Sequence, residues 1–483
     1  MKNSKFLDTL RTLNKDELSA FGKHLARNYG KEKIALDVFD YIKAFFPDYC
    51  DDKKLDIAYA YKKIFGGDIA NDPYNRKKIL NALSDLNGRL KEFLLWQKSG
   101  DESLESRILW LLIAKERGLK HEEDKQFESI RAHITASSIK STADLLKGIL
   151  VNYSYYYTPT NSKLKNRQFA LAQCTTDLDK YYAITRLKLA CEVATLQNLT
   201  DATFQQNWQL HIDSIMKWPG LAEEPLFQIY TEAFRFIVEQ SEAAFYKTED
   251  LLERNLQIIG KEELHVILSY LHNFTARQIR QNKPEYVPII HRLNRLALEQ
   301  GYFQRPGFIS PTQFTNVVTI ACDQGDLDWA NLFITQCSPY LKKQQIEDTV
   351  KLANSIVLFK KKQYDEVLKE LGNVDFIDLE HAIRSKSLVI RCMYELKCDS
   401  PQFDSYYHAF EIFLYRKKKK RPEAVNSLLN FIRLLKLIYE GNTPRATLVE
   451  KINATSSLYY RDWLLEKAAG NTSQYAAQRR KRL

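Results

Sequence analysis

Large apolar residues recur at nearly even intervals through the middle of the chain. The intervals between successive members are 41, 41, 41, 37 and 39 residues. A fixed period of about 35 to 45 residues is typical of stacked helix pairs. The pattern therefore predicts a helical repeat array with recurrent positions at Phe204, Phe245, Tyr286, Leu327, Tyr364 and Phe403.

The sequence around two of these positions indicates how one unit is built. The segments 325–333 (GDLDWANLF) and 363–371 (QYDEVLKEL) each follow an apolar stripe. In the stripe from Ile346 to Val357 the apolar residues are four, three and four apart, which places them on one helix face. We expect a helix, a short polar turn and a second helix that the recurrent residue opens. Three residues later, Ala330 or Val367 would let the helices approach closely.

These units resemble tetratricopeptide repeats, in which a G-x-[YF]-x-x-A turn joins two helices. The resemblance lies in GDLDWA and, less closely, in QYDEVL. The period is longer than the usual value of about 34 residues, so HEAT-type repeats, at about 40 to 47 residues, are the structural alternative. Leu327 also stands where the repeat pattern has an aromatic residue.

The chain as a whole resembles an uncharacterised family of Bacteroidota helical proteins. The resemblance is carried by LNKDELSAFGKHL near the start, by LDKYYAITRLKLACEVA at 178–194 and by TNVVTIACDQGDLDWANLFI at 315–334. It implies an all-α fold in which helix pairs form a right-handed superhelix. It implies no activity and no catalytic residues.

Three regions are expected along the chain. Residues 1–98 are predicted to form a helical N-terminal domain, and residues 104–470 to form the repeat array, with a linker at 98–103 between them. Residues 471–483 are expected to be a basic, flexible tail. Within the first domain, helices are predicted at 15–28, 31–46, 53–65 and 74–97. The first of these starts at Asn14, with Glu17 three residues later in the pattern of a capping box.

Composition supports an all-α, cytoplasmic protein. The chain has 16 Gly and 13 Pro, and it lacks the turn signals of β-hairpins between alternating strands. The longest uncharged apolar run, 108–114, is too short for a signal peptide or a membrane span. The seven cysteines are scattered without close pairing, which favours a reducing compartment over a disulfide framework.

The net charge of +11 is unevenly distributed. Residues 1–100 contain 19 basic and 14 acidic side chains, and residues 101–410 contain 36 and 40. Residues 411–483 contain 16 basic and only 6 acidic side chains. The basic character of the chain therefore belongs mainly to its C-terminal region.

Two basic clusters account for most of this excess. They consist of Arg416, Lys417, Lys418, Lys419, Lys420 and Arg421, and of Arg479, Arg480, Lys481 and Arg482. Such clusters attract nucleic acid or acidic partners. The favoured interpretation of the first cluster is an exposed turn between two apolar helices, kept soluble by its charge. Nucleic-acid or nucleoprotein binding through this region is the alternative.

The N-terminal domain offers a second, weaker nucleic-acid candidate. The helix at 53–65 and the basic segment starting at 73 are arranged somewhat like a helix-turn-helix. The connection 66–72 is longer than the three or four residues that such a motif uses. We therefore expect the charged residues to form an exposed face, opposite an inward face of Ile79, Leu83, Leu86 and Leu90.

Enzymatic motifs are absent from the sequence, which has no G-x-G-x-x-G, no Walker motif, no H-E-x-x-H and no C-x-x-C. Cys392 and Cys398 are six residues apart, so they point to different sides of a helix. The cluster HEED at 121–124 is interpreted as a solvated turn. No catalytic function, cofactor or metal is therefore expected.

The preferred binding site is a polar stripe on the helix around residue 270. It consists of Ser269, Asn273, Arg277 and Arg280, opposite an apolar face of Leu264, Ile267, Leu268 and Leu271. In tetratricopeptide-like arrays the first helix of each pair lines the concave surface, and two arginines there would pair with carboxylates. The sequence thus predicts a non-enzymatic interaction scaffold for a protein or peptide, although simple solvation also explains such a stripe.

Overall fold

The computed structural model of the chain is helical throughout the part that it describes. It describes residues 1, 4–47, 49, 51, 53–66, 73–100, 103–137, 141–158, 164–199, 208–281, 283–305, 309–372, 376, 378–417 and 422–470. These ranges contain α-helices and short 3-10 helices and no β-strand. The predicted all-α class is therefore confirmed.

The chain divides into two compact units, Met1–Thr185 and Arg186–Leu483. The predicted regions 1–98 and 104–470 stay predictions, and residues 471–483 lie outside the described part. The first unit contains α1 (Lys5–Leu10), α2 (Lys15–Tyr29), α3 (Lys33–Lys43), α4 (Ile57–Phe65), α5 (Pro73–Ser99), α6 (Leu104–Glu116), α7 (Lys120–Ala136), α8 (Thr142–Tyr156) and the beginning of α9 (Leu164–Leu199).

The helices at the start of the first unit pack around α5, which contacts each of α1, α2, α3 and α4. Their core is rich in aromatic side chains. The ring of Phe21 lies 5.2 Å from that of Phe39 and 5.4 Å from that of Phe93. All three side chains are buried, so α5 serves as the central element of this cluster.

The capping box predicted at the start of α2 is confirmed. The Asn14 side chain accepts a hydrogen bond from the backbone N–H of Glu17, whose carboxylate accepts one from the Asn14 N–H, both at 2.9 Å. Other helices differ from the prediction, and α3 spans Lys33–Lys43 instead of 31–46. α1 was not predicted, and α4 begins at Ile57 instead of residue 53 because Asp56 caps its N-terminus.

The inward face predicted for α5 is also confirmed, since Ile79, Leu83, Leu86 and Leu90 are all buried. The Lys78 ammonium lies 4.1 Å from the centre of the Phe65 ring. This contact joins α5 to α4. Most of the connection that would decide the helix-turn-helix alternative, residues 67–72, lies outside the described part.

The interpretation of residues 121–124 as a solvated turn is wrong. They lie inside α7, and Glu123 is only 4% exposed. Its carboxylate accepts a hydrogen bond from the Thr158 hydroxyl, and Asp124 accepts one from the Tyr155 hydroxyl at 2.5 Å. The carboxylates of this cluster thus join α7 to the C-terminal end of α8.

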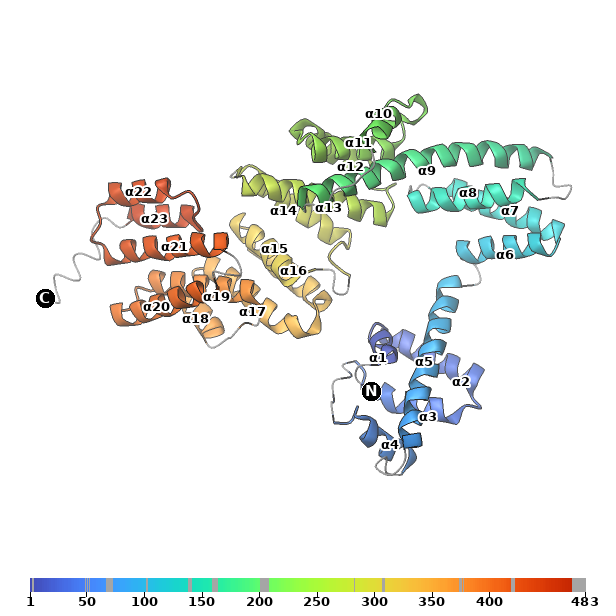
Figure 1. Cartoon of the computed structure of the whole chain (residues 1–483), viewed down its shortest axis with the longest axis horizontal. Helices are drawn as coiled ribbons and strands as arrows, with labels where there is room; N and C mark the ends of the chain where they lie inside the picture. Colours follow the sequence, from blue (N-terminus) through green and yellow to red (C-terminus); the bar gives the residue numbers. More distant parts are fainter. Residues whose placement is uncertain are drawn as a thin grey trace. The chain divides into compact units, whose positions relative to one another are not determined.

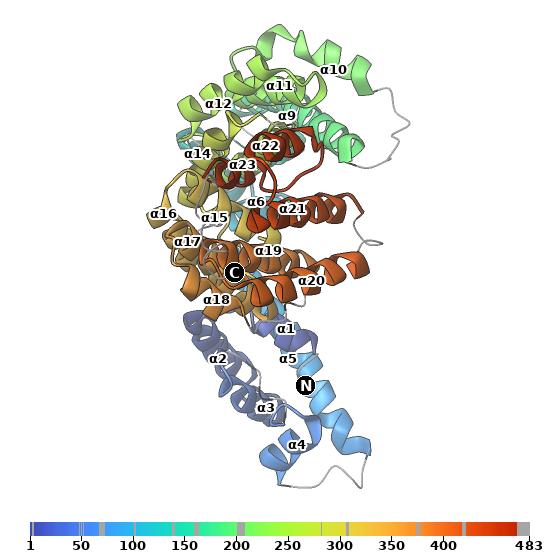
Figure 2. The same cartoon turned by 90° about the vertical axis from the view of Figure 1, so that its left-hand side faces the viewer.

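The second unit is a succession of helix pairs that follow one another in chain order (Figure 1). It contains the end of α9 and then α10 (Trp208–Met216), α11 (Pro225–Val238), α12 (Glu242–Asn255), α13 (Lys261–Arg280), α14 (Tyr286–Glu299), α15 (Pro311–Asp323), α16 (Leu327–Cys337), α17 (Ile346–Lys360), α18 (Tyr364–Leu371), α19 (Leu379–Glu395), α20 (Ser400–Lys417), α21 (Pro422–Glu440), α22 (Arg445–Ala454) and α23 (Arg461–Gly470). From α11 onward, the two helices of each pair contact each other. Figure 2 shows α20, the second helix of one pair, beside α21, the first helix of the next pair, and the two helices are in contact.

The recurrent apolar residues mark the second helix of each pair, as predicted. Tyr286, Leu327 and Tyr364 are the first residues of α14, α16 and α18. Phe245 and Phe403 lie in the first turn of α12 and α20. Phe204 falls outside the described residues. The small residues three positions later are 0% exposed, as close helix approach requires: Ala330 and Val367.

Phe245 shows why such a residue matters to the array. Its ring lies 5.8 Å from that of Phe236 in its own pair, and 4.8 Å and 6.0 Å from those of Phe274 and Tyr286 in the next pair. One fully buried side chain thus holds two successive helix pairs together.

Small hydroxyl residues are buried on the first helices of the last pairs. Ser355 in α17 and Ser387 in α19 are both 0% exposed. Each hydroxyl donates to the backbone carbonyl four residues earlier, at Lys351 and Ile383, over 2.8 Å. Their hydrogen-bonding capacity is therefore satisfied within their own helices.

No helix in the described ranges is long and apolar enough to cross a membrane. The cysteines in those ranges are free thiols, and burial raises the pKa of Cys337 and Cys392 to about 12. These thiols are therefore protonated and weakly nucleophilic at neutral pH.

Candidate binding groove

A groove of about 260 Å³ lies on the first helices of successive pairs in the second unit. α15, α17, α19 and α21 contribute side chains to it at three- and four-residue steps, so each helix turns one face toward it. The segment between α22 and α23 adds Tyr459 and Tyr460. Residues from four pairs therefore surround one ligand-sized space.

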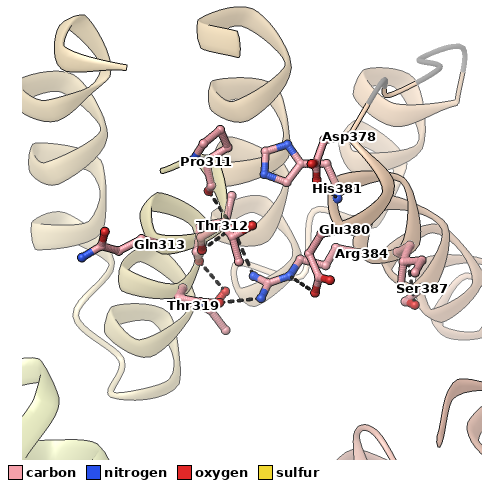
Figure 3. Close-up of polar contacts among 12 residues, drawn as sticks. Pro311, Thr312, Gln313, Thr319, Asp378, Glu380, His381, Arg384 and Ser387 are labelled. Atoms are coloured by element: carbon pink, nitrogen blue, oxygen red, sulfur yellow. Dashed lines mark hydrogen bonds and ion pairs between the residues drawn. The ribbon is translucent and has the colours of Figure 1, made fainter. Parts of the chain in front are cut away.

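Arg384 joins two helices of the groove wall, α19 and α15. It extends from α19 toward α15 (Figure 3). There it donates hydrogen bonds to the Thr315 hydroxyl at 3.1 Å and to the Asn316 side-chain oxygen at 2.5 Å. Its Nε also donates to Glu380 at 3.4 Å. With acceptors on three sides, Arg384 positions α19 against α15 and is already engaged within the protein.

Arg391 lies one heptad further along α19 and has a different environment. Its guanidinium carbon is 3.9 Å from the ring centre of Tyr460, 4.6 Å from that of Phe359 and 6.0 Å from that of Trp463. Its Nε donates to the Ser387 carbonyl at 3.3 Å. Aromatic rings and one backbone carbonyl therefore hold the guanidinium in place.

The position of Tyr460 depends on an unusual backbone conformation. Its φ is +56°, in the left-handed region that a bulky residue rarely adopts. The neighbouring Arg461 donates to the backbone carbonyls of Ile452 and Thr455, which fixes the segment after α22. The Tyr460 ring also packs edge-on against Phe431, 5.0 Å away. The surroundings thus maintain a strained residue whose ring covers Arg391.

The charges of the groove do not cancel. Lys360 pairs with Asp323 at 2.6 Å, and Glu380 pairs with Arg384. Arg391 is the remaining charged residue of the lining, and no carboxylate in the described part of the chain lies within ion-pair distance of it. The groove therefore has one surplus positive charge, and it is located on a side chain that is held in place.

His381 lies beside the groove wall, near the N-terminus of α19. Its backbone N–H donates to the Asp378 carboxylate at 3.0 Å, which caps the helix. The ring is almost fully buried, and burial lowers the pKa of His381 below its ordinary value of 6.5. Burial also lowers the pKa of His265 and His272 in α13. All three rings are therefore neutral at pH 7.

The buried histidines predict acid sensitivity of the second unit. A pKa that is lower in the folded state means that the unfolded chain binds more protons below pH 6.5. The stability that depends on the neutral rings is fully present above pH 6.5. It should be lost as the pH falls toward the lowered pKa values of the three histidines. Urea unfolding at pH 7.5 and pH 5.5, followed by circular dichroism, should show a lower midpoint at pH 5.5.

The variant His272→Asn should reduce that difference between the two midpoints, because it removes one ring whose pKa is lowered in the folded state. The matched control is His408→Asn, since the His408 side chain is 60% exposed. If the midpoints at pH 7.5 and pH 5.5 differ as much in His272→Asn as in the wild-type protein, groups other than His272 cause the acid sensitivity.

The stripe predicted on α13 is only partly available to a partner. Ser269 is engaged, because its hydroxyl donates to the His265 carbonyl and is 2.9 Å from the Tyr302 hydroxyl. Asn273 and Arg280 are exposed and Arg277 is half-buried. The structure gives these three side chains no hydrogen bond or ion pair among described residues, so their partner-binding role stays a prediction.

The opposite, apolar face of α13 is buried as predicted, at Leu264, Ile267, Leu268 and Leu271. None of the four stripe residues lines the groove. Of the predicted basic clusters, Arg416 and Lys417 end α20. The others lie outside the described residues: Lys418, Lys419, Lys420, Arg421, Arg479, Arg480, Lys481 and Arg482.

A second cavity of about 250 Å³ lies between α12 and α14. Its arginines are already paired, Arg292 with Glu249 at 2.7 Å and Arg295 with Asp326 at 3.1 Å. His291 also lies 3.0 Å from Asp326. Because both of its arginines are paired within the protein, this cavity is a weaker candidate than the groove for binding an anionic group.

Sequence reasoning missed the groove arginines, although a signal was present. Glu380, Arg384, Leu388 and Arg391 recur at steps of four, four and three, on one face of a first helix. Comparisons with known proteins add nothing to this assignment, since no family model, curated protein or solved structure matches the chain. The candidate site thus depends on geometry and chemistry alone.

Proposed function

We propose that this chain is a non-enzymatic interaction scaffold that binds a segment of a partner protein in the groove. In this proposal the helix pairs stack as tetratricopeptide-like repeats in a right-handed superhelix, as the resemblance to the Bacteroidota helical family implies. The groove is then part of the concave face. A cytoplasmic location belongs to the same proposal and agrees with the free thiols of the described cysteines.

One observation carries the proposal, namely that first helices of four successive pairs contribute to a single groove. In repeat arrays the first helices form the inner surface, and each pair contacts its neighbours. Here α15 contacts α17, and α17 contacts α19. The chemistry also fits, because apolar and aromatic side chains supply contact area and one cation supplies orientation.

The predicted stripe on α13 belongs to the proposal as a second contact. Asn273, Arg277 and Arg280 lie on a first helix, like the groove residues. A partner that extends beyond the groove would meet them on an earlier pair. Their contribution is separable, since substitutions in α13 leave the groove lining unchanged.

Filling the groove should abolish partner binding. Thr319 lines the groove from α15, and Thr335 is an exposed residue of α16 outside it. Both hydroxyls donate to the carbonyl four residues earlier, at 2.8 and 2.9 Å. Peptides selected on the wild-type protein from a displayed random library should bind Thr319→Trp about tenfold or more weakly, because the added ring occupies their site.

The matched control Thr335→Trp should bind the same peptides with wild-type affinity, measured by fluorescence anisotropy. Failure of the library to yield any binder would contradict the proposal, as would equal binding by the two variants. A short labelled single-stranded DNA tests the alternative function. Binding of this probe with a steep loss at higher salt would favour nucleic-acid binding instead.

A further inference from the structure

The guanidinium of Arg391 is held in place, but only part of its hydrogen-bonding capacity is used among the described residues. Rings of Phe359 and Tyr460 pack near its guanidinium, at 4.6 and 3.9 Å, and the Ser387 carbonyl accepts from its Nε. What remains is the pair of terminal NH₂ groups. They have no hydrogen-bond acceptor among the described residues, yet the side chain is half-buried and lines the groove.

This arrangement favours a ligand that accepts two hydrogen bonds in the plane of the guanidinium. A carboxylate matches the spacing of the guanidinium donors and bears the opposite charge. Since aromatic contacts already restrict the side chain, little conformational entropy is lost when the ligand binds. A guanidinium that is ordered before binding is suited to specific recognition.

The neighbouring residues limit the ligand further. Asp323 and Glu380 are already paired with Lys360 and Arg384, so Arg391 supplies a single surplus positive charge. One carboxylate balances that charge, whereas a dianionic phosphate would leave a buried negative charge without compensation. Ile356 and Leu428 supply apolar surface in the same space. The groove therefore suits a carboxylate that lies beside an apolar side chain.

We propose that Arg391 binds a carboxylate of the partner segment, either that of an Asp or Glu side chain or that of its C-terminus. This inference rests on the proposed function, because it names the chemistry that the groove recognises. It assigns the specificity of the groove to one residue and gives Arg384 a positioning role.

The test uses the full-length protein and the peptides selected on it as probes. Each peptide is made with its acidic side chains, with Asp and Glu replaced by Asn and Gln, and with an amidated C-terminus. Loss of the critical carboxylate should weaken binding to the wild-type protein by about tenfold or more. The modification that causes this loss identifies the source of the carboxylate.

The same peptides are then measured against Arg391→Gln, which removes the charge and keeps an unbranched polar side chain. Acidic and neutralised peptides should bind this variant within about threefold of each other, because the carboxylate has lost its partner. Arg391→Lys should restore only part of the discrimination, since lysine keeps the charge without the planar donor edge. The control is Arg433→Gln, which removes an exposed arginine bonded to the Tyr415 hydroxyl on α20.

Thermal unfolding of each variant identifies any that fails to fold, and in that case Arg391→Lys alone decides the test. Equal binding of acidic and neutralised peptides by the wild-type protein overturns the carboxylate proposal, as does discrimination that survives in Arg391→Gln. Peptides that bind in these cases and lose affinity in Thr319→Trp leave the scaffold function standing. Absence of any groove-dependent peptide overturns both proposals.

Discussion

Replacing Phe245 by alanine should lower the free energy of unfolding of the second unit by about 3 to 5 kcal/mol, the range for a large aromatic side chain lost from a packed core. The ring is fully buried and contacts rings from its own pair and the next. Its removal therefore costs hydrophobic transfer energy and leaves a cavity between two pairs. In an array where each unit is stabilised by its neighbours, this interface is expected to fail first.

The measurement is urea denaturation followed by circular dichroism at 222 nm, with the midpoint as the readout. The control is Leu332→Ala, which truncates a second-helix side chain that is 47% exposed. This control should change stability by less than about 0.5 kcal/mol. Similar midpoints for the two variants would show that the recurrent positions do not hold successive pairs together.

The second large effect is expected at a buried ion pair. Glu263 in α13 is 2% exposed, and its carboxylate accepts from the Lys188 ammonium of α9 at 2.9 Å. The Tyr230 hydroxyl also donates to it, and burial beside this carboxylate keeps the pKa of Tyr230 far above its ordinary value. Lys188→Met removes the cation and leaves the carboxylate buried. Because Lys188 is partly exposed, we expect a loss of about 2 to 3 kcal/mol.

Adding Glu263→Gln to Lys188→Met should recover part of that loss, because a neutral amide costs less to bury than a carboxylate that has lost the Lys188 cation. The control is Arg254→Met, which breaks an exposed pair with Asp250 and should cost less than about 0.5 kcal/mol. The measurement compares the urea midpoints of the wild-type protein, Lys188→Met, the double variant and Arg254→Met. A double variant less stable than Lys188→Met alone would mean that the carboxylate is stabilised mainly by its other partners.

The sequence was most informative where the relevant contacts are local. The capping box at Asn14 and the helix start at Tyr286 are decided by residues a few positions away, and both were predicted. α1 was missed because a helix of six residues is too short to show a recognisable helical pattern of apolar residues. Residues 121–124 were misinterpreted because charge alone suggested solvent, whereas Thr158 and Tyr155 supply the partners that allow burial of their carboxylates.

The candidate site was least predictable, since it is formed by distant parts of the chain. The rings that hold Arg391 come from Phe359 and Tyr460, which are 32 and 69 residues away along the sequence. The Tyr460 ring lies beside Arg391 in a backbone conformation that is left-handed, and no local sequence motif predicts this conformation. Sequence periodicity showed which helices come first in each pair, but it could not show which arginine lacks a partner. Ser269, Asn273, Arg277 and Arg280 satisfied the same pattern on α13.

The buried serines of α17 and α19 have a consequence for the range of partners. The hydroxyls of Ser355 and Ser387 donate to carbonyls of their own helices. At these two positions the serines therefore form no hydrogen bond between α17 and α19, and the helices are in contact through packing alone. The directional bonds that position α19 come from Arg384 and run to α15. Beside the cation, a partner then meets mainly apolar and aromatic side chains, which accept different residues of similar character. Different partners should therefore share one acidic position and vary freely around it.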